Sequence, residues 1–481
     1  MDANWKSWNF ETFPGGASSA VAPDLLPDNQ TAWGQNVAFR GAKVQTRPPI
    51  ACRLVLPPGL IQGASYFGVQ GGMIVVMIAG KPYRLRIGGT DPAGYSSEEI
   101  SLASPNSGII KQVWMTQTVE TLVIQDGQSD AILYNGSVAT RAGYQQVPRG
   151  RMMAYGNGRL WVAINANELV AGDIRTRDPG SELNFTETTY LSGGGSLWFS
   201  RPMTGLTFIP VTGTTDYGTL LVLGVDFADS VRADITDRDS WGTYPGFVTT
   251  VLRSIGCAGA WSLAQVNQDV YWRDGLAQIR SLRASLQDES GAGSSPLSRE
   301  VSRIVDFDSQ QLLPWVSSIY FNNRLLMTAS PFLNPQGGVS FRDLVSLDFA
   351  PISTMQGKTS PAYDGNWQGV DWTQLVAGQF GGRQRAFGLS SDNDGFNRLW
   401  ELGASDTVHD ITLSCGSGSP EVTSPIGSFI EYPRVDFSDP KQRKRLTRLD
   451  VWLSEIVDEI TLTPWWRTDN DQQWTQWQET I

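Results

Sequence analysis

Short apolar runs separated by tight turns recur along most of this chain. In one of them, residues 73–79 are apolar, a Gly-Lys-Pro turn follows, and residues 83–85 continue the pattern. Related segments occur at residues 121–136, 153–162, 269–276, 319–326 and 385–400. Most of them place Asn-Gly, Asp-Gly or Asn-Asn at the turn, where positive φ is tolerated, between residues that favour strands. Because one hairpin cannot bury its apolar face, the series must pack together. The pattern predicts an all-β protein, a β-propeller, which is more typical of a rigid platform than of a catalyst.

The spacing of these segments predicts three parts. Residues 1–60, rich in Asn, Pro and Gly, form an extended N-terminal arm that ends in two short strands at 36–40 and 43–47. Residues 61–404 carry the hairpins at intervals that bracket the period of a propeller blade, which predicts about six or seven blades. Residues 405–481 begin with a polar stretch and then alternate apolar and polar positions, which predicts a separate β-sandwich-like domain. Its expected strands cover residues 429–437, 449–453 and 459–467.

Composition argues against a protein that binds nucleic acid through its charge. The formal net charge is -11 and the pI is near 4.8, which argues against a chain held on nucleic acid by phosphate neutralisation. The 18 tryptophans are spread along the chain, and large rigid aromatics favour cores and interfaces. Stacking on a carbohydrate is the alternative use for some of them.

The cysteines and the N-terminus indicate where the chain is made. Cys52, Cys257 and Cys415 are far apart in sequence, which argues against a disulfide framework and against a CxxC metal site. We expect them to be reduced and buried. No basic segment followed by an apolar one opens the chain, and the longest apolar run is too short to span a bilayer. The expected product is made in the cytosol, not exported, and has no membrane span.

Candidate catalytic groups are few. The single histidine, His409, lies in a polar segment, and no Gly-x-Ser-x-Gly elbow offers it a nucleophile. The glycine-rich stretch at 192–196 lacks the Gly-Lys-Ser/Thr ending of a phosphate loop, so a surface loop is the simpler interpretation. Paired carboxylates could serve a glycosidase, but nothing in the sequence singles out two of them. We predict that the chain is not an enzyme and has no catalytic, cofactor or metal residues.

Two charged patterns have competing interpretations. Residues 390–395, Ser-Ser-Asp-Asn-Asp-Gly, alternate oxygen ligands before a glycine, and Glu401 stands where a calcium loop would have its closing ligand. A polar turn between two strands needs no ion and is the favoured interpretation. Residues 441–445 with Arg448 form the densest basic run. A solvated edge and a contact with an acidic neighbouring subunit are equally favoured for this run, and DNA phosphates are the weakest of the three.

Several short phrases resemble one family. The N-terminal series runs Leu26-Pro27-Asp28-Asn29-Gln30-Thr31-Ala32, Asn36-Val37, Arg40-Gly41 and Arg47-Pro48. Further phrases are Gln125-Asp126-Gly127, Tyr134-Asn135-Gly136, Ile255-Gly256-Cys257-Ala258, Val270-Tyr271-Trp272-Arg273-Asp274-Gly275, and Trp466-Arg467-Thr468-Asp469 with Trp474 and Trp477. Together they resemble bacteriophage tail hub and nozzle proteins, the tail tubular and packaged-DNA stabilisation proteins of short-tailed phages.

The resemblance implies a structural virion protein. It would multimerise around the tail axis, often as a ring of about six subunits, below the portal and adaptor. It would extend the DNA channel and help retain packaged double-stranded DNA until ejection, without binding that DNA tightly. Its place would be the virion tail, and the host cytoplasm during assembly. The family brings no catalytic residues. The alternatives are a glycan- or receptor-binding propeller, with exposed Trp or Tyr around a pocket, and a propeller glycosidase, with two carboxylates facing each other in a central cleft.

Overall fold

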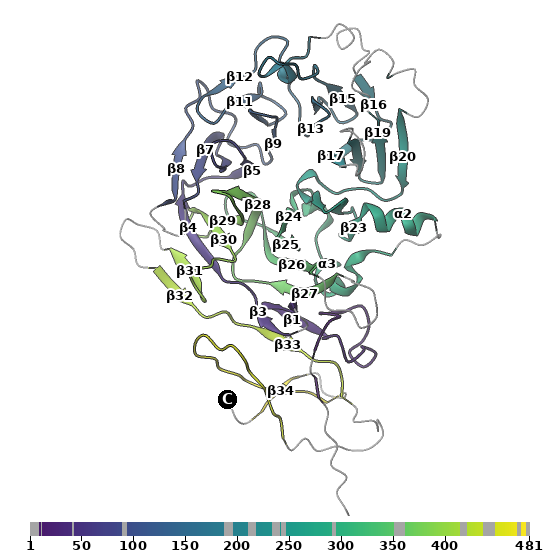
Figure 1. Ribbon diagram of the computed structural model, residues 1–481, viewed down its shortest axis with the longest axis vertical. Coiled ribbons are helices and arrows are strands. Elements are labelled where there is room, and N and C mark those ends of the chain that lie inside the picture. Colours follow the sequence, from purple (N-terminus) through teal and green to yellow (C-terminus); the bar gives the residue numbers. More distant parts are fainter. Residues whose placement is uncertain are drawn as a thin grey trace, which may run out of the picture.

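Strands dominate the protein (Figure 1). The computed structural model describes residues 9–10, 12–40, 43–88, 94–186, 196–209, 218–232, 241, 247–290, 295–350, 361–413, 421–435, 448–468 and 473–477. Everything said below about structure refers to these residues. Within them, no helix combines the length and the apolarity that crossing a bilayer requires.

Among the described strands, five antiparallel sheets of consecutive strands stand apart from the rest as blades. The first holds β5 (Ile61–Phe67), β6 (Met73–Ile78), β7 (Lys81–Arg86) and β8 (Ser96–Glu99). The second holds β9 (Trp114–Gln117), β10 (Leu122–Gln125), β11 (Ile132–Tyr134) and β12 (Ala139–Arg141). The third holds β13 (Met153–Gly156), β14 (Arg159–Ala163), β15 (Glu168–Ala171) and β16 (Ser196–Trp198). The fourth holds β17 (Met203–Ile209), β18 (Thr219–Gly224), β19 (Phe227–Val231) and β20 (Val248–Arg253). The fifth holds β21 (Ala264–Val266), β22 (Asp269–Arg273) and β23 (Ile279–Ser281).

A twelve-stranded sheet contains most of the remaining strands. Its central part is β24 (Ser318–Phe321), β25 (Arg324–Leu333), β26 (Val339–Asp348), β27 (Ala362–Trp367), β28 (Trp372–Phe380), β29 (Arg383–Ser391) and β30 (Asn397–Leu402). The ends of the chain add β1 (Trp33–Gln35), β4 (Ile50–Leu56), β31 (Asp410–Leu413), β32 (Glu421–Ser424) and β33 (Phe429–Glu431). Two small sheets pair β2 (Val37–Ala38) with β3 (Gln45–Thr46) and β34 (Trp465–Trp466) with β35 (Thr475–Gln476). The helices include α2 (Leu282–Ser290) and α3 (Ser302–Val305), with short 3₁₀ helices at Ser181–Leu183, Ala260–Ser262, Leu297–Val301 and Gln310–Trp315.

The sheets close into a β-propeller. Their first strands contact one another in order, from β5 to β9, β13 and β17, and then through the 3₁₀ helix before β21. β21 contacts β24, β24 contacts β28, and β28 returns to β5. The N-terminal strand β4 pairs antiparallel with β30 from Leu402↔Ile50 to Asn397↔Leu56, so residues from both ends of the chain share one sheet. The predicted all-β propeller is confirmed.

The number of separate blades differs from the expected six or seven. β26 and β28 pair at Phe341↔Trp372, and this bridge merges strands β24–β30 into one sheet instead of separating them into blades. The sequence shows the two hairpin series but not this bridge between them, because a single residue pair leaves no periodic pattern.

The core lies in layers between neighbouring blades. On β6, Val76 joins an apolar cluster with β29 and β30, whereas the adjacent Val75 joins a cluster with β10. On β10, Ile124 packs back toward β6 and Val123 packs forward toward β14. Because both faces of these middle strands are buried, they are continuous apolar runs and not alternating ones. This explains the apolar runs in the sequence.

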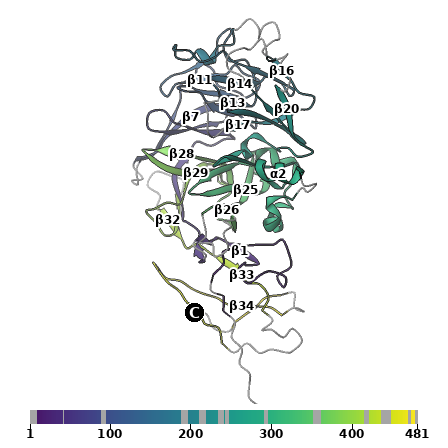
Figure 2. The ribbon, with the colours of Figure 1, turned by 45° about the vertical axis from the view of Figure 1, so that its right-hand side comes forward.

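The C-terminal region differs from the expected sandwich. β31 and β32 extend the large sheet beside β4, and β33 pairs with β1. Residues 449–453 and 459–463, expected to be strands, have no ladder, and nearly all their side chains are exposed. Their alternating pattern lacks a partner strand among the described residues. Figures 1 and 2 agree that β33 and β34 lie at one end of the molecule, beyond β32 and far from β11.

Candidate functional site

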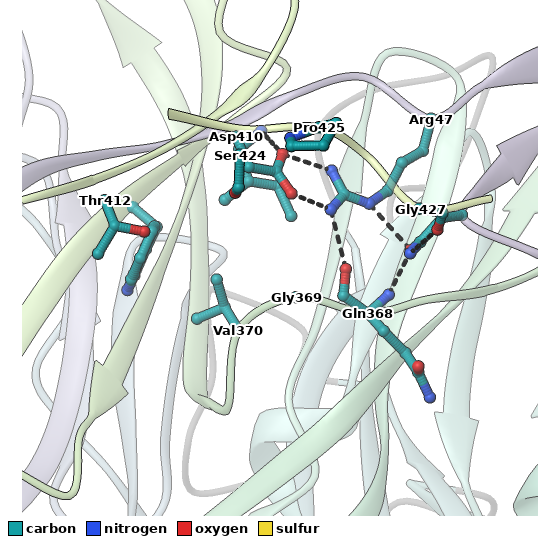
Figure 3. A pocket seen from close by; sticks show the side chains of 12 residues that line it. Arg47, Gln368, Gly369, Val370, Asp410, Thr412, Ser424, Pro425 and Gly427 are labelled. Carbon is teal, nitrogen blue, oxygen red and sulfur yellow. Dashed lines mark hydrogen bonds and ion pairs between the residues drawn. The ribbon is translucent and has the colours of Figure 1, made fainter. Parts of the chain in front are cut away.

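A pocket of about 340 Å³ lies where the two ends of the chain meet (Figure 3). Four segments line it: the N-terminal region up to β4, the turn between β27 and β28, strand β30, and the C-terminal strands β31 and β32 with the residues that follow. The lining residues are Asn36, Arg47, Ile50, Gln368, Gly369, Val370, Trp400, Asp410, Thr412, Ser424, Pro425 and Gly427. The pocket therefore marks the junction that closes the propeller.

Arg47 is the centre of this junction. Its side chain is 1% exposed, and Nη1 and Nη2 donate to the two carboxylate oxygens of Asp410 at 2.9 and 2.5 Å. Nε donates to Asn36 Oδ1 at 3.0 Å, and the remaining N–H groups donate to the carbonyl oxygens of Pro48 and Gln368 at 3.0 and 2.9 Å. Asp410 also accepts from the backbone N–H of Ile50 at 2.9 Å. All five guanidinium N–H groups are thus occupied.

The occupied N–H groups of Arg47 limit which ligands the pocket can bind. Arg47 cannot neutralise an incoming anion unless it releases an acceptor that it already has. The aromatic wall, Trp400, is 5% exposed and donates its indole N–H to Ser390, so it offers no open stacking face. The pocket is best interpreted as a structural joint that ties three distant segments together.

A second buried joint holds β4 to β30. Arg53 donates to Glu401 at 2.8 Å and to both oxygens of Asp406 at 2.9 and 2.5 Å. Arg385 donates to the other oxygen of Glu401, and the Tyr95 hydroxyl completes the cluster. Burial, reinforced by the charge of Glu401, raises the pKa of Tyr95 to about 12. Hydrogen bonds from Arg53 lower the pKa of Asp406.

Asp308 and Asp343 are two nearby carboxylates that can be weighed as a glycosidase pair. Both are buried, and Ser330 bridges them, donating its N–H to Asp308 and its hydroxyl to Asp343. Arg273 donates to the other oxygen of Asp308 at 2.6 Å. Burial nevertheless raises the pKa of Asp308. The other oxygen of Asp343 accepts from the amides of Asn366 and Gln368, both at 2.7 Å. All four oxygens are occupied, so neither carboxylate is placed to face a sugar.

His409 contacts a carboxylate and not a nucleophile. Its Nε2 lies 2.8 Å from Oδ2 of Asp458, and its side chain is 33% exposed. The backbone N–H of Glu459 and the His409 contact both lower the pKa of Asp458. The contact ties the segment around residue 458 to the start of β31, which the sequence did not predict.

The calcium-like pattern forms an arginine-paired turn. Asp392 and Asp394 both pair with Arg398, and Ser390 donates to Asp392 at 2.8 Å. Glu401 points away, toward Arg53 and Arg385. In the described part of the chain no group of three or more His, Cys, Asp or Glu side chains is arranged to hold a metal ion.

Of the other predicted features, some lie within the described residues and some lie outside them. Cys52 and Cys257 are buried, as expected. Cys415, residues 192–195 and the basic run 441–445 lie outside the described residues. The arginine joints were missed at the sequence level, where Arg47-Pro48 appeared only as part of a family phrase. Their acceptors are more than 300 residues away, and no local pattern marks such pairs.

Comparison with known proteins identifies no family. No protein-family model matches the chain, and no curated protein matches it. A chain in the crystal structure of the mitotic checkpoint complex is similar at 13% identity with a TM-score of 0.40, covering 74% of this chain and 92% of that chain. BBS1N, solved in complex with ARL6DN, is similar at 10% identity and a TM-score of 0.42, covering 74% and 98%. BamB from Moraxella catarrhalis is similar at 12% identity and a TM-score of 0.34, covering 75% and 88%. Similarity at this level carries no argument about activity or partners, and the resemblance to phage tail proteins stays a prediction.

Proposed function

We propose that this chain is a structural protein of a bacteriophage tail, of the hub or nozzle class. It multimerises around the tail axis, extends the DNA channel and helps retain packaged DNA until ejection. The observation that carries the proposal is the exposed apolar C-terminal segment beyond a propeller that its own N-terminal strand closes. A closed propeller is a stiff unit, and a contiguous exposed apolar segment marks a site of association.

The family phrases in the sequence supply the virion context. The neighbours would be the portal–adaptor proteins above and other tail proteins below, in the virion tail after assembly in the host cytoplasm. We further assign β24–β27 and β28–β30 with β4 as two more blades, which with the five separate sheets would give seven. Copies of such a wheel would meet through heterologous contacts, often about six to a ring.

The net charge is consistent with a channel that does not bind the DNA passing through it. The net charge of -11 gives a wall that repels phosphates, and many of the buried cations are already paired. The buried arginines 47, 53 and 273 each hold a carboxylate of the same chain. They stabilise the fold and are not available to DNA.

Electron microscopy and mass photometry test this proposal. The purified chain, alone and mixed with the portal, adaptor and tail proteins encoded beside it, should form closed rings stacked on the adaptor. Monodisperse monomers under all these conditions would contradict the proposal. Glycan-array binding or turnover of a chromogenic glycoside would instead support the carbohydrate alternatives.

A further inference from the structure

The C-terminal segment, residues 448–466, has the composition of strands, but most of its length has no partner strand among the residues that the structure describes. Leu449, Val451 and Leu453 occupy every second position at its start, and all three side chains are exposed. The side chain of Trp452, between the last two, is 93% exposed. Every residue from 448 to 461 is exposed. Only its last two residues pair, as β34 with β35. Apolar side chains displayed along unpaired backbone are the features of a segment that completes a sheet elsewhere.

The sequence of this segment indicates which sheet. Residues 459–462, Glu-Ile-Thr-Leu, repeat the pattern of β31, which is Asp-Ile-Thr-Leu at 410–413. The match extends to the following position, which is Ser414 after β31 and Thr463 in the segment. A strand with the side chains of β31 is suited to the same neighbour as β31.

β31 lies between β4 and β32, and because β4 pairs with β30 on its other side, β32 is the neighbour that keeps an unpaired edge among the described strands. β31 pairs antiparallel with it through Asp410↔Ser424, Ile411↔Thr423 and Thr412↔Val422. β32 ends the order of the twelve-stranded sheet, and β31 is its one partner among the described strands. Val422 is 54% exposed, and Thr423 and Ser424 are exposed as well. The outer edge of β32 can therefore accept a second strand in the register of the first.

Within one chain, residues 459–462 form no ladder with β32, whose one partner among the described strands is β31. His409 and Asp458 occupy equivalent places, one residue before each copy of the repeat. Their side chains meet at 2.8 Å, which ties the start of the segment to the start of its own β31. The segment therefore leaves the outer edge of its own β32 open.

Charge favours a second copy of this chain as the partner. Residues 441–448 carry five cations and no acid, namely Lys441, Arg443, Lys444, Arg445 and Arg448. Residues 449–466 carry four acids and no cation, namely Asp450, Glu455, Asp458 and Glu459. In a head-to-tail contact the acidic stretch of one copy can meet the basic stretch of the next, which offsets the repulsion between two chains of net charge -11.

We propose that residues 459–462 of one copy add as an antiparallel strand to the outer edge of β32 in the neighbouring copy. The register follows β31: Glu459 opposite Ser424, Ile460 opposite Thr423 and Thr461 opposite Val422. Since the same chain offers the strand at one place and the edge at another, the contact is heterologous and propagates around a ring. The inference rests on the self-assembly in the proposed function and specifies its contact.

Site-directed cross-linking of the full-length chain tests the register. Thr461→Cys and Val422→Cys are made in separate chains, each carrying Cys415→Ser, and mixed before oxidation. Directly opposed cross-strand residues come close enough for a disulfide, so a cross-linked dimer should form in the mixture and not with either variant alone. Val457→Cys, outside the repeat, is the matched control and should not link to Val422→Cys.

Association energetics provide the second test. Ile460→Asp should weaken self-association at least about tenfold, whereas Val457→Asp should change it by less than about threefold. Both side chains are exposed in the single chain, so neither substitution should shift its thermal midpoint. Equal cross-linking of the control would overturn the inference. If the native chain forms rings but Thr461→Cys and Val422→Cys do not cross-link, the strand contact alone is overturned. If the native chain does not assemble, the proposed function is overturned too.

Discussion

Arg47 is buried at the propeller closure as a charged side chain, and Asp410 is its compensating charge. Removing one partner of such a pair leaves an uncompensated buried charge. Asp410→Asn, which keeps the shape, should therefore lower the free energy of unfolding by about 3–5 kcal/mol. Urea denaturation measures this change.

The control for Asp410 is an exposed ion pair. Asp130 pairs with Arg149 at 2.7 Å, but both side chains are more than half exposed. Asp130→Asn should change the stability by less than about 1 kcal/mol. Equal effects of the two substitutions would show that Arg47 is not a joint.

Asp406 makes stability depend on pH in the acid range. Hydrogen bonds from Arg53 hold the pKa of Asp406 below its ordinary value of 3.8 in the folded chain. The folded state binds this proton less tightly than the unfolded state, so the contribution of Asp406 is complete above about pH 4. It is lost as the pH falls through the folded pKa.

Asp406→Asn should remove this pH dependence. We expect a loss of about 1–2 kcal/mol at pH 7, because two charge-assisted bonds to a nearly buried arginine weaken, and a smaller loss near pH 2. Urea midpoints at the two pH values give the difference. Asp450→Asn, at an exposed pair with Arg448, should leave both midpoints unchanged, and a constant difference for Asp406→Asn would contradict the assignment.

At the scale of single side chains, little of the site was accessible from the sequence. The Arg47–Asp410 and Arg53–Glu401 pairs join positions that are close only after the ring has closed. The calcium-like pattern at 390–395 was visible in the sequence, but the sequence did not indicate that Asp392 and Asp394 pair with Arg398. Oxygen spacing along a strand does not reveal which cation lies opposite.

At the scale of strands, the backbones near β5 and β9 approach so closely that one position requires glycine. Gly63, on β5, lies against β9, and a Cβ there would collide with the carbonyl oxygen of Val113. Because backbone cannot rearrange cheaply, Gly63→Ala should lower the stability by about 1–3 kcal/mol. Thermal denaturation measures this, with Gly427→Ala as the control, since a Cβ at Gly427 has nothing within 4 Å and should be nearly neutral. Equal stability of the two variants would mean that β5 and β9 are further apart.

Local hairpins were predictable and their assembly only partly so. The segments at 73–85, 121–136 and 153–162 became pairs of adjacent strands in three blades, because strand-forming residues and turn pairs act locally. The alternating segments at 449–463 also favour strands in sequence, but they have no partner strand in the part of the chain that the structure describes. Alternation predicts that a strand can form, whereas pairing depends on an edge that the sequence does not locate.

For the whole molecule, charge separates a channel from a DNA-binding protein. A protein that holds duplex DNA does so by releasing counterions from many phosphates, which requires clustered free cations. This chain has a net charge of -11, and its densest basic run, 441–448, is followed directly by acidic residues. We expect affinity for duplex DNA weaker than about 10⁻⁴ M at physiological salt, the weak end of non-specific binding. Fluorescence anisotropy of a labelled duplex, at physiological and at low salt, measures it.

The matched variant for this experiment replaces Lys441, Arg443, Lys444 and Arg445 with glutamine. If the basic run serves contacts between copies, the variant should lose self-association while DNA binding stays as weak as in the native chain. If the run instead grips phosphates, the native chain should bind with an affinity near 10⁻⁶ M that falls steeply with salt, and the variant should lose that binding. The second result would contradict a passive channel, because a wall that holds DNA at every subunit would resist ejection.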